Sequence, residues 1–375
     1  MKNKKIPEIR FPGFEDDWKE RTIDEVAERY DNLRVPITAS ERVTGDIPYY
    51  GANGIQDYVE GYTHDGEFIL VAEDGANDLQ NYPVQYVQGK IWVNNHAHVL
   101  QGKDELADNK FLMNAIKNVN IEPFLVGGGR AKLNAEVMMK LKLYLSSIKE
   151  QNKLGLFFEN LSDLITFHQQ KLMNLKQTKQ GFLQKMFPKE GEKVPEIRFP
   201  GFTDDWEQRK TKEVCSISTG KSNTQDKTED GKYPFYVRSA TIERSIKYLY
   251  NEEAILTVGD GVGTGKVYHY VNGKYDLHQR VYRMFDFIDG VSAKYFYYYF
   301  SNHFYKRVQA MTAKTSVDSV RLEMISDMII NIPSIEEQNV LADFFSNIDE
   351  TINLHQRELD LLQETKKAFL QKMFI

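Results

Sequence analysis

The sequence contains a single cysteine, Cys215, among 375 residues. An internal disulfide is therefore excluded, and no group of cysteines and histidines has the spacing of a zinc site. No apolar run reaches the roughly 18 residues that a membrane-spanning helix requires. The basic start, Met-Lys-Asn-Lys-Lys, continues into Pro7 and Glu8 without the apolar segment of a secretory signal. We therefore expect reducing, cytoplasmic surroundings and no membrane segment.

Motifs that carry catalysis are also missing. The glycine-rich segment Asp260–Lys266 fails the Walker pattern, because Val267 stands where Ser or Thr is needed. It follows a predicted strand and precedes another, so we expect a hairpin turn rather than a cofactor loop. No nucleophile elbow, zinc-protease motif or methyltransferase Asn/Asp-Pro-Pro-aromatic tetrapeptide is present. His96 and His98 have no third ligand nearby in the sequence, so we expect a satisfied surface pair and a chain without enzymatic activity.

What the sequence does contain is a duplication. Three segments occur twice: Pro7–Phe14 and Pro195–Phe202, which are identical, Ile148–Asn152 and Ile335–Asn339, and Phe182–Phe187 and Phe369–Phe374. The first pair is offset by 188 residues and the others by 187, so the two half-chains are nearly equal in length. Solenoid repeats are much shorter, roughly 20 to 50 residues. Two copies of one unit therefore make up the chain.

The two copies diverge in their middles, approximately residues 22–145 and 210–332. Residues 19–145 hold 13 basic and 19 acidic side chains, whereas residues 209–332 hold 18 basic and 14 acidic ones. The second middle could present a basic face unaided. The first would need segregated charges or a basic partner to approach nucleic acid.

Each half ends in a helix with a heptad seam. Apolar residues recur at alternating spacings of four and three, the pattern of a coiled coil. The predicted interface consists of Leu154, Phe158, Leu161, Ile165, Leu172, Leu175 and Phe182 in the first helix and Leu341, Phe345, Ile348, Ile352, Leu359, Leu362 and Phe369 in the second. Pro188 ends the first helix, and Ser334 with Glu337 predicts a capping box for the second.

We expect the two helices to pack on each other in antiparallel fashion, as duplicated units related by a pseudo-twofold would. His168, His355, Lys179 and Lys366 interrupt the seam. Such residues more often fix the register than perform chemistry, with the lysine stems reaching out to solvent.

The middles mix strand and helix patterns. Segments rich in β-branched and aromatic residues predict strands at 67–72, 89–93, 254–258, 266–271 and 280–285, and helices are expected at 109–117 and 294–307. The predicted fold class is α+β: two similar domains joined by two long helices in an antiparallel coiled coil. The predicted boundaries are 1–146 for the first domain, 147–187 for the first helix, 188–332 for the second domain with a linker at 188–194, and 333–375 for the second helix.

This arrangement resembles the specificity (S) subunit of type I restriction-modification systems. The resemblance rests on the repeated Pro-x-Ile-Arg-Phe segment, on Trp18 and Trp206, on the Asp74-Gly75 and Asp260-Gly261 turns and on Gln151 and Gln338, and it covers essentially the whole chain. One feature departs from the family pattern. An early Ser-Thr-Gly-Lys turn occurs at 218–221, whereas the first half has Tyr30-Asp-Asn-Leu33.

The resemblance implies that each middle is a target recognition domain reading one half of a split, asymmetric sequence in double-stranded DNA. It implies two methylation subunits and additional restriction subunits as partners, with S-adenosylmethionine, ATP and Mg on those partners and no cofactor or metal on this chain. Polar loop residues are the candidate DNA contacts: Asn53, Asn95, Arg130, Lys132 and Asn134 in the first domain, and Arg238, Ser239, Arg280, Lys314, Thr315, Ser316 and Arg321 in the second.

Two other hypotheses stay open at this point. A bivalent adaptor of the same architecture could bind proteins through its divergent middles without DNA selectivity. A self-contained modification enzyme or nuclease would need catalytic motifs that the sequence lacks.

Overall fold

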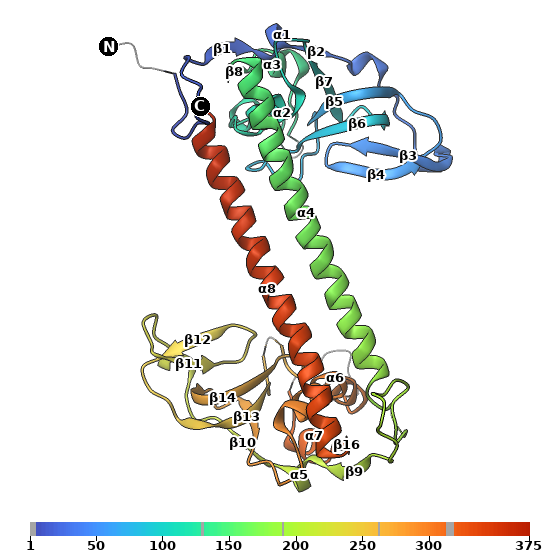
Figure 1. The fold of residues 1–375 in the computed structure, drawn as a ribbon, viewed down its shortest axis with the longest axis vertical. Coiled ribbons are helices and arrows are strands. Elements are labelled where there is room, and N and C mark those ends of the chain that lie inside the picture. Colours follow the sequence, from blue (N-terminus) through green and yellow to red (C-terminus); the bar gives the residue numbers. More distant parts are fainter. Residues whose placement is uncertain (1–4, 129–130, 190, 262, 313–318) are drawn as a thin grey trace. The chain divides into compact units, whose positions relative to one another are not determined.

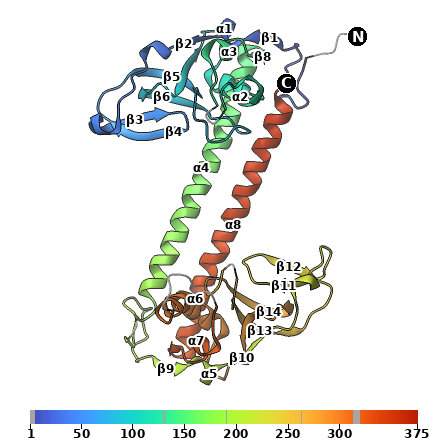
Figure 2. The ribbon, with the colours of Figure 1, turned by 180° about the vertical axis from the view of Figure 1, so that it is seen from behind.

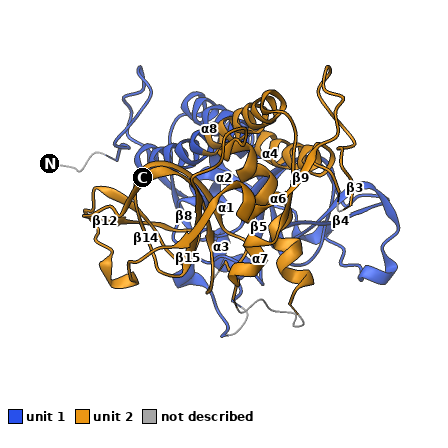
Figure 3. Ribbon diagram, turned by 90° about the horizontal axis from the view of Figure 1, so that it is seen from below, with its two compact units in different colours: residues 1–170, 357–375 blue, residues 171–356 orange. Residues whose placement is uncertain are grey.

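The structure is a computed structural model that describes residues 5–128, 131–189, 191–261, 263–312 and 319–375 (Figures 1 and 2). The chain divides into two units, residues 1–170 with 357–375 and residues 171–356 (Figure 3). Each unit contains one α+β domain and a portion of both long helices. The dividing lines fall within the helices, so the long helices belong to both units.

The first domain is built from a sheet, a small two-stranded sheet and short helices. In chain order its elements are β1 Lys19–Thr22, α1 Ile23–Val26, β2 Ala27–Arg29, η1 Asp31–Leu33, η2 Ala39–Glu41, β3 Thr44–Gly51, β4 Gly54–Val59, β5 His64–Ala72, β6 Val84–Val93, β7 Ala97–Gly102, α2 Asn109–Lys117, η3 Glu122–Phe124, α3 Ala135–Met139 and β8 Lys142–Leu145. The long helix α4, Ile148–Lys185, follows.

The second domain repeats this plan. Its elements are β9 Glu207–Lys210, α5 Thr211–Val214, β10 Ser216–Thr219, η4 Thr224–Asp226, β11 Tyr233–Tyr236, β12 Ile242–Ser245, β13 Tyr250–Val258, β14 Tyr268–Leu277, β15 Val281–Phe285, α6 Ala293–Ala310, α7 Leu322–Ser326 and β16 Ile329–Ile332. The second long helix, α8, spans Ile335–Met373.

The two six-stranded sheets share one topology. Their strand orders, β2-β7-β5-β6-β3-β4 and β10-β15-β13-β14-β11-β12, correspond position by position. All neighbours are antiparallel except β3 with β6 and β11 with β14. The predicted α+β fold class and the internal duplication are confirmed. The strand pattern did not predict β3 and β4, whose turn at Ala52-Asn53 joins a two-stranded ribbon.

The helices α2 and α6 start at equivalent caps. Asp108 accepts a hydrogen bond from the Phe111 amide at 2.7 Å, and Ser292 accepts one from the Tyr295 amide at 3.3 Å. A side-chain oxygen at this position satisfies one of the free amides of the first turn. Both helices then bury an aromatic-rich face against their own sheet.

Within each unit the two long helices run antiparallel. In the first unit, the Phe157 and Phe369 ring centroids lie 5.4 Å apart and Lys366 donates to Ser162 at 2.8 Å. In the second unit, Lys179 pairs with Asp349 at 2.5 Å. Every predicted seam residue is buried or half-buried. In the part of the chain that is described, no helix is both long enough and apolar enough to span a membrane.

The repeated arms, residues 7–14 and 195–202, hold the helix ends in place. The Ile9 amide donates to the carbonyl of Lys372 at the end of α8, and the Ile197 amide donates to that of Lys185 at the end of α4, both at 2.9 Å. Arg10 makes two hydrogen bonds to Glu150, at 2.6 and 2.8 Å. The first arm therefore joins the end of one long helix to the start of the other.

The second arm makes the same ion pair, and it corrects the predicted capping box of α8. The Glu337 amide does donate to the Ser334 hydroxyl at 3.3 Å. The Glu337 carboxylate, however, binds Arg198 at 2.6 and 2.7 Å rather than returning to the cap. A bidentate guanidinium pair outcompetes a single backbone amide for a carboxylate.

The last repeated segment ends inside a core. Phe374 stacks on Phe111 with the centroids 5.3 Å apart, and Phe187 stacks on Phe345 at 5.7 Å. The two tryptophans that follow the arms contact the repeated phenylalanines: Trp18 contacts Phe374, and Trp206 contacts Phe187. The residues shared by both copies thus form the joints between arm, domain and helix.

Candidate nucleic-acid interface

Four segments of the first domain meet in what we call the first loop cluster: Ala52-Asn53, Glu73–Asn77, Asn94–His96 and Lys132–Asn134. The Asn53 side chain donates to the Gly75 carbonyl at 2.9 Å and accepts from the Asn77 amide at 3.0 Å. The His96 ring binds Asp74 at 2.5 Å. A β-bridge joins Asp74 to Lys132. The loops that close the strands are therefore braced against one another.

The second domain has an equivalent second loop cluster, formed by Arg238-Ser239, Gly259–Gly261, Gln279-Arg280 and Ser319–Arg321. Its main-chain bonds match those of the first. The Gly259 amide donates to the Arg280 carbonyl at 2.8 Å, as the Glu73 amide does to that of His96. A bridge joins Asp260 to Ser319 as Asp74 is joined to Lys132. The backbone scaffold is therefore common to both clusters.

The side chains on this scaffold differ. Asp260 faces two arginines, Arg238 at 3.6 Å and Arg280 at 3.7 Å, whose side chains are 48% and 64% exposed. Asp74 faces a histidine instead. The second cluster consequently carries two exposed guanidinium groups, which suit phosphate and base-edge recognition.

The predicted DNA contacts that lie on described residues fall into these two clusters. Asn53, Asn95, Lys132 and Asn134 belong to the first, and Arg238, Ser239, Arg280 and Arg321 belong to the second. Arg130, Lys314, Thr315 and Ser316 lie outside the described residues. The Asn53 amide is engaged at both ends within its own cluster, so it acts as a brace for the loop at 75–77.

A network of ion pairs centred on Glu73 stabilises the first loop cluster. Glu73 binds Lys132 at 2.8 Å and Arg34 at 2.6 Å. Burial would raise the pKa of Glu73, but the hydrogen bonds from Lys132 and Arg34 outweigh it and leave that pKa lowered. Lys132 is thus partly neutralised before any ligand arrives.

His98 belongs to this network, and the expectation of a surface pair was wrong for it. Its side chain is only 1% exposed and binds Asp31 at 2.7 Å and the Leu133 carbonyl at 2.9 Å. Sequence reasoning missed its partners because Asp31 and Leu133 lie 67 and 35 residues away along the chain. Only the spacing of two from His96 hinted at a shared face.

Asp31, Glu73 and His98 place three potential ligand atoms within 4.8 Å of one another. That spacing would suit a metal ion. The carboxylates, however, already face the cations Arg34 and Lys132. We therefore assign the group to charge pairing within the domain.

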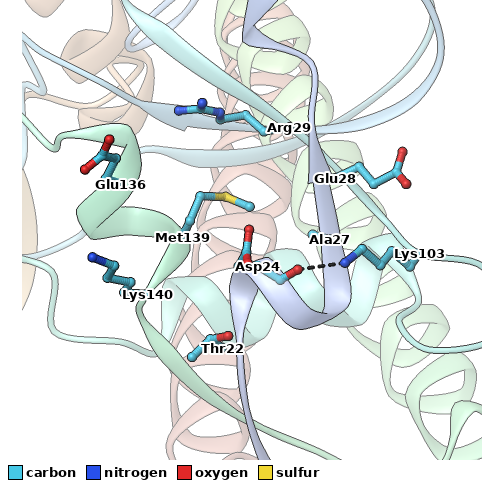
Figure 4. Close-up of a pocket in the computed structure, with 9 residues that line it drawn as sticks. All are labelled: Thr22, Asp24, Ala27, Glu28, Arg29, Lys103, Glu136, Met139 and Lys140. Atoms are coloured by element: carbon cyan, nitrogen blue, oxygen red, sulfur yellow. Dashed lines mark hydrogen bonds between the residues drawn. The ribbon is translucent and has the colours of Figure 1, made fainter.

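A separate cleft of about 700 Å³ lies between the α1–β2 segment and α3 (Figure 4). Its lining is mixed in charge and contains none of the predicted DNA contacts: Thr22, Asp24, Ala27, Glu28, Arg29, Lys103, Glu136, Met139 and Lys140. Lys103 is held by the carbonyls of Asp24 at 2.7 Å and Glu25 at 3.2 Å. The cleft combines opposite charges without the pairing of nucleophile and base that hydrolysis needs.

Two copies of one α+β domain, each with a loop cluster and a share of two long helices, define a duplicated two-domain recognition protein. The sequence matches the type I restriction modification DNA specificity domain twice, over residues 15–177 and 203–364. The chain belongs to this family and is a type I specificity subunit.

Similar proteins agree with this assignment. A putative type I restriction enzyme specificity subunit of Haemophilus influenzae is 45% identical over 162 residues, which cover 43% of this chain and 41% of that relative. The MjaVIII specificity subunit of Methanocaldococcus jannaschii is 22% identical over 98% of this chain and 93% of its own. The S subunit structure from M. genitalium has a TM-score of 0.77, 15% identity and 99% coverage of both chains, which supports the fold.

Proposed function

We propose that this chain reads a bipartite, asymmetric DNA target, one half through each loop cluster, and directs adenine-N6 methylation and restriction by partner subunits. One observation carries the proposal. The two clusters share their main-chain scaffold but present different side chains, which is what two readers of unlike half-sites require.

The two readers should depend differently on phosphate contacts. The exposed Arg280 and Arg238 of the second cluster can neutralise phosphates directly. Lys132 of the first cluster is paired with Glu73, and its domain has an acidic balance. We therefore expect the second half-site to contribute more of the salt-dependent affinity.

The catalytic steps belong to partners in this proposal. Two methylation subunits would bind S-adenosylmethionine and flip the adenine, and restriction subunits would use ATP and Mg. The chain itself would hold no cofactor and perform no chemistry. Because its proposed target is genomic DNA, it would work in the cytoplasm.

Methylome sequencing tests the proposal directly. Cells that express this chain with its methylation subunit would be compared with cells that lack only this chain. We expect new N6-methyladenine at one motif made of two unlike halves separated by a fixed gap. An assembled complex that methylates no motif would refute the proposal and favour the adaptor hypothesis.

A further inference from the structure

One buried residue in each loop cluster lies beside a candidate DNA contact in the sequence. Leu133 lies between Lys132 and Asn134 and is fully buried, and Val320 precedes Arg321 and is 5% exposed. The amides of Leu133 and Val320 donate to the carbonyls of Glu73 and Gly259, both at 2.7 Å. Each therefore anchors an exposed segment to the sheet.

The carbonyl of each anchor is held as well. His98 Nε2 lies 2.9 Å from the Leu133 carbonyl, and the Tyr282 hydroxyl donates to the Val320 carbonyl at 3.3 Å. His98 and Tyr282 occupy equivalent positions, since His98 pairs with Val71 in the first sheet and Tyr282 pairs with Thr257 in the second. Two unlike side chains thus make the same bond in the two copies.

The hydrogen-bonding role of His98 Nε2 follows from its partner. A carbonyl only accepts, so Nε2 donates the bond to Leu133. The other nitrogen faces the Asp31 carboxylate at 2.7 Å, with Glu73 at 3.6 Å. We call the bond from His98 to the Leu133 carbonyl the first tether and the bond from Tyr282 to the Val320 carbonyl the second. The first tether is therefore part of a charged network that also includes Arg34 and Lys132, whereas the second is made by a single neutral hydroxyl.

We propose that His98 and Tyr282 are positioning residues for DNA reading. By fixing the carbonyls of Leu133 and Val320, they set where the flanking side chains Lys132, Asn134 and Arg321 meet the DNA. This inference rests on the proposed function. It predicts that breaking one tether relaxes base preference in one half of the target and leaves the other half unchanged.

Tyr282→Phe is the sharpest test because it removes only the hydroxyl. In the assembled complex, binding to DNA libraries randomised in one half-site at a time should show preference in the second-domain half falling roughly tenfold, within the range of one lost base contact. Tyr248→Phe is the matched control, since Tyr248 is 41% exposed in the same domain. It should keep both preferences.

Two substitutions of His98 separate the tether from the contact with Asp31. The amide nitrogen of Asn matches Nδ1 and that of Gln matches Nε2, so His98→Asn loses the bond to Leu133 while His98→Gln can keep it. We expect relaxed preference in the first half for Asn and a preference near the wild type for Gln. Amide hydrogen exchange of the full chain should rise at 131–137 in His98→Asn and remain slow in His98→Gln.

The possible outcomes distinguish failure of the proposed function from failure of the tethers. A wild-type complex without sequence preference would overturn the proposed function and this inference with it. Wild-type preference that survives in both Tyr282→Phe and His98→Asn would overturn the tethers alone. Equal loss in both halves, or a Gln variant as impaired as the Asn variant, would also overturn them, because it would indicate general destabilisation or a role confined to Asp31.

Discussion

Arg198 and Glu337 show how single residues of the repeated segments hold a domain to its helix. The Glu337 side chain is 1% exposed and Arg198 is its bidentate partner. Gln338, the next residue, accepts from the Ser292 amide and donates to the Gly290 and Pro333 carbonyls, all at 2.9 Å. Gln151 makes the corresponding bonds around Asp108 in the first unit. These contacts between helix and domain account for the presence of the Glu-Gln pair in both copies.

Arg198→Ala should destabilise the second unit by about 3 kcal/mol or more, because it leaves a buried carboxylate without its counter-charge. Urea unfolding of the full chain measures this loss. Arg198→Lys should recover only part of it, since an ammonium cannot form the two-pronged contact. Arg209→Ala is the control. Its pair with Glu207 is exposed, so the unfolding midpoint should barely move. A midpoint unchanged in Arg198→Ala would contradict the assignment.

Asp31 should contribute to the acid stability of the first unit. Burial would raise its pKa, but the hydrogen bonds from His98 and the Val99 amide and the nearby positive charges together outweigh that effect and leave the pKa lowered. A carboxyl whose folded pKa is below its unfolded value stabilises the fold above about pH 4 and loses that contribution as the pH falls further. Asp31→Asn should therefore flatten the loss of unfolding free energy on acidification. Urea titrations across this range measure the effect, with the exposed Asp46→Asn as control. If the idea is wrong, the unfolding free energy of Asp31→Asn will fall with pH as steeply as that of the wild type.

At the scale of residues, the sequence predicted individual polar loop residues but not which residues they contact. Asn53 and Lys132 were identified as loop residues, but their partners Gly75 and Glu73 are reached through the fold. The missing glycine turn of the first copy illustrates the difficulty. Gly220 lies so close to the Leu277 carbonyl that a Cβ would approach it to 2.2 Å, whereas the first copy forms a short 3-10 helix, η1, at Asp31–Leu33. Such a replacement cannot be deduced from a motif.

At the scale of elements, the heptad seam was the strongest sequence signal. Leu161 packs on the core of the first unit and Ile348 on that of the second. The central strands were also predicted, because β-branched runs bounded by turns are local. The ribbon β3–β4 and the parallel pairs β3–β6 and β11–β14 were not, since they depend on pairings between distant segments.

Substituting both Leu161 and Ile348 with Asp should lower the thermal midpoint sharply. Both positions are half-buried against the core, and a carboxylate desolvated there without a partner costs about 2 kcal/mol. Scanning calorimetry of the full chain measures the effect. Leu164→Asp with Leu354→Asp is the matched control, because these side chains are 42% and 52% exposed on the same helices. Midpoints that fall equally in both double variants would refute the seam.

At the scale of the whole molecule, the joints and the proposed DNA readers use different residues. The joints involve the arms, the Glu-Gln pairs and the helix ends, all present in both copies. The loop clusters proposed to read DNA lie in the divergent middles. The duplication was therefore predictable from the sequence, whereas the joint between the arm at Ile9 and the helix end at Lys372 was not, because 363 residues separate them.

Replacing residues 22–145 with residues 210–332 should produce a chain with two copies of one reader. We expect its methylated motif to carry the same half-site twice, and the original first half to disappear. Methylome sequencing of cells with the chimera and the methylation subunit gives the answer. A chimera that still yields the original first half would place DNA reading outside the middles.

The arms also have an evolutionary meaning. Pro7–Phe14 and Pro195–Phe202 are identical, and they make the same main-chain bond and the same ion pair in the two units. Genetic recombination within the segments that encode them would deliver a foreign middle to joints that already fit it. If the middles read DNA as proposed, one such exchange would give a lineage a new recognition sequence without the cost of a misfolded joint.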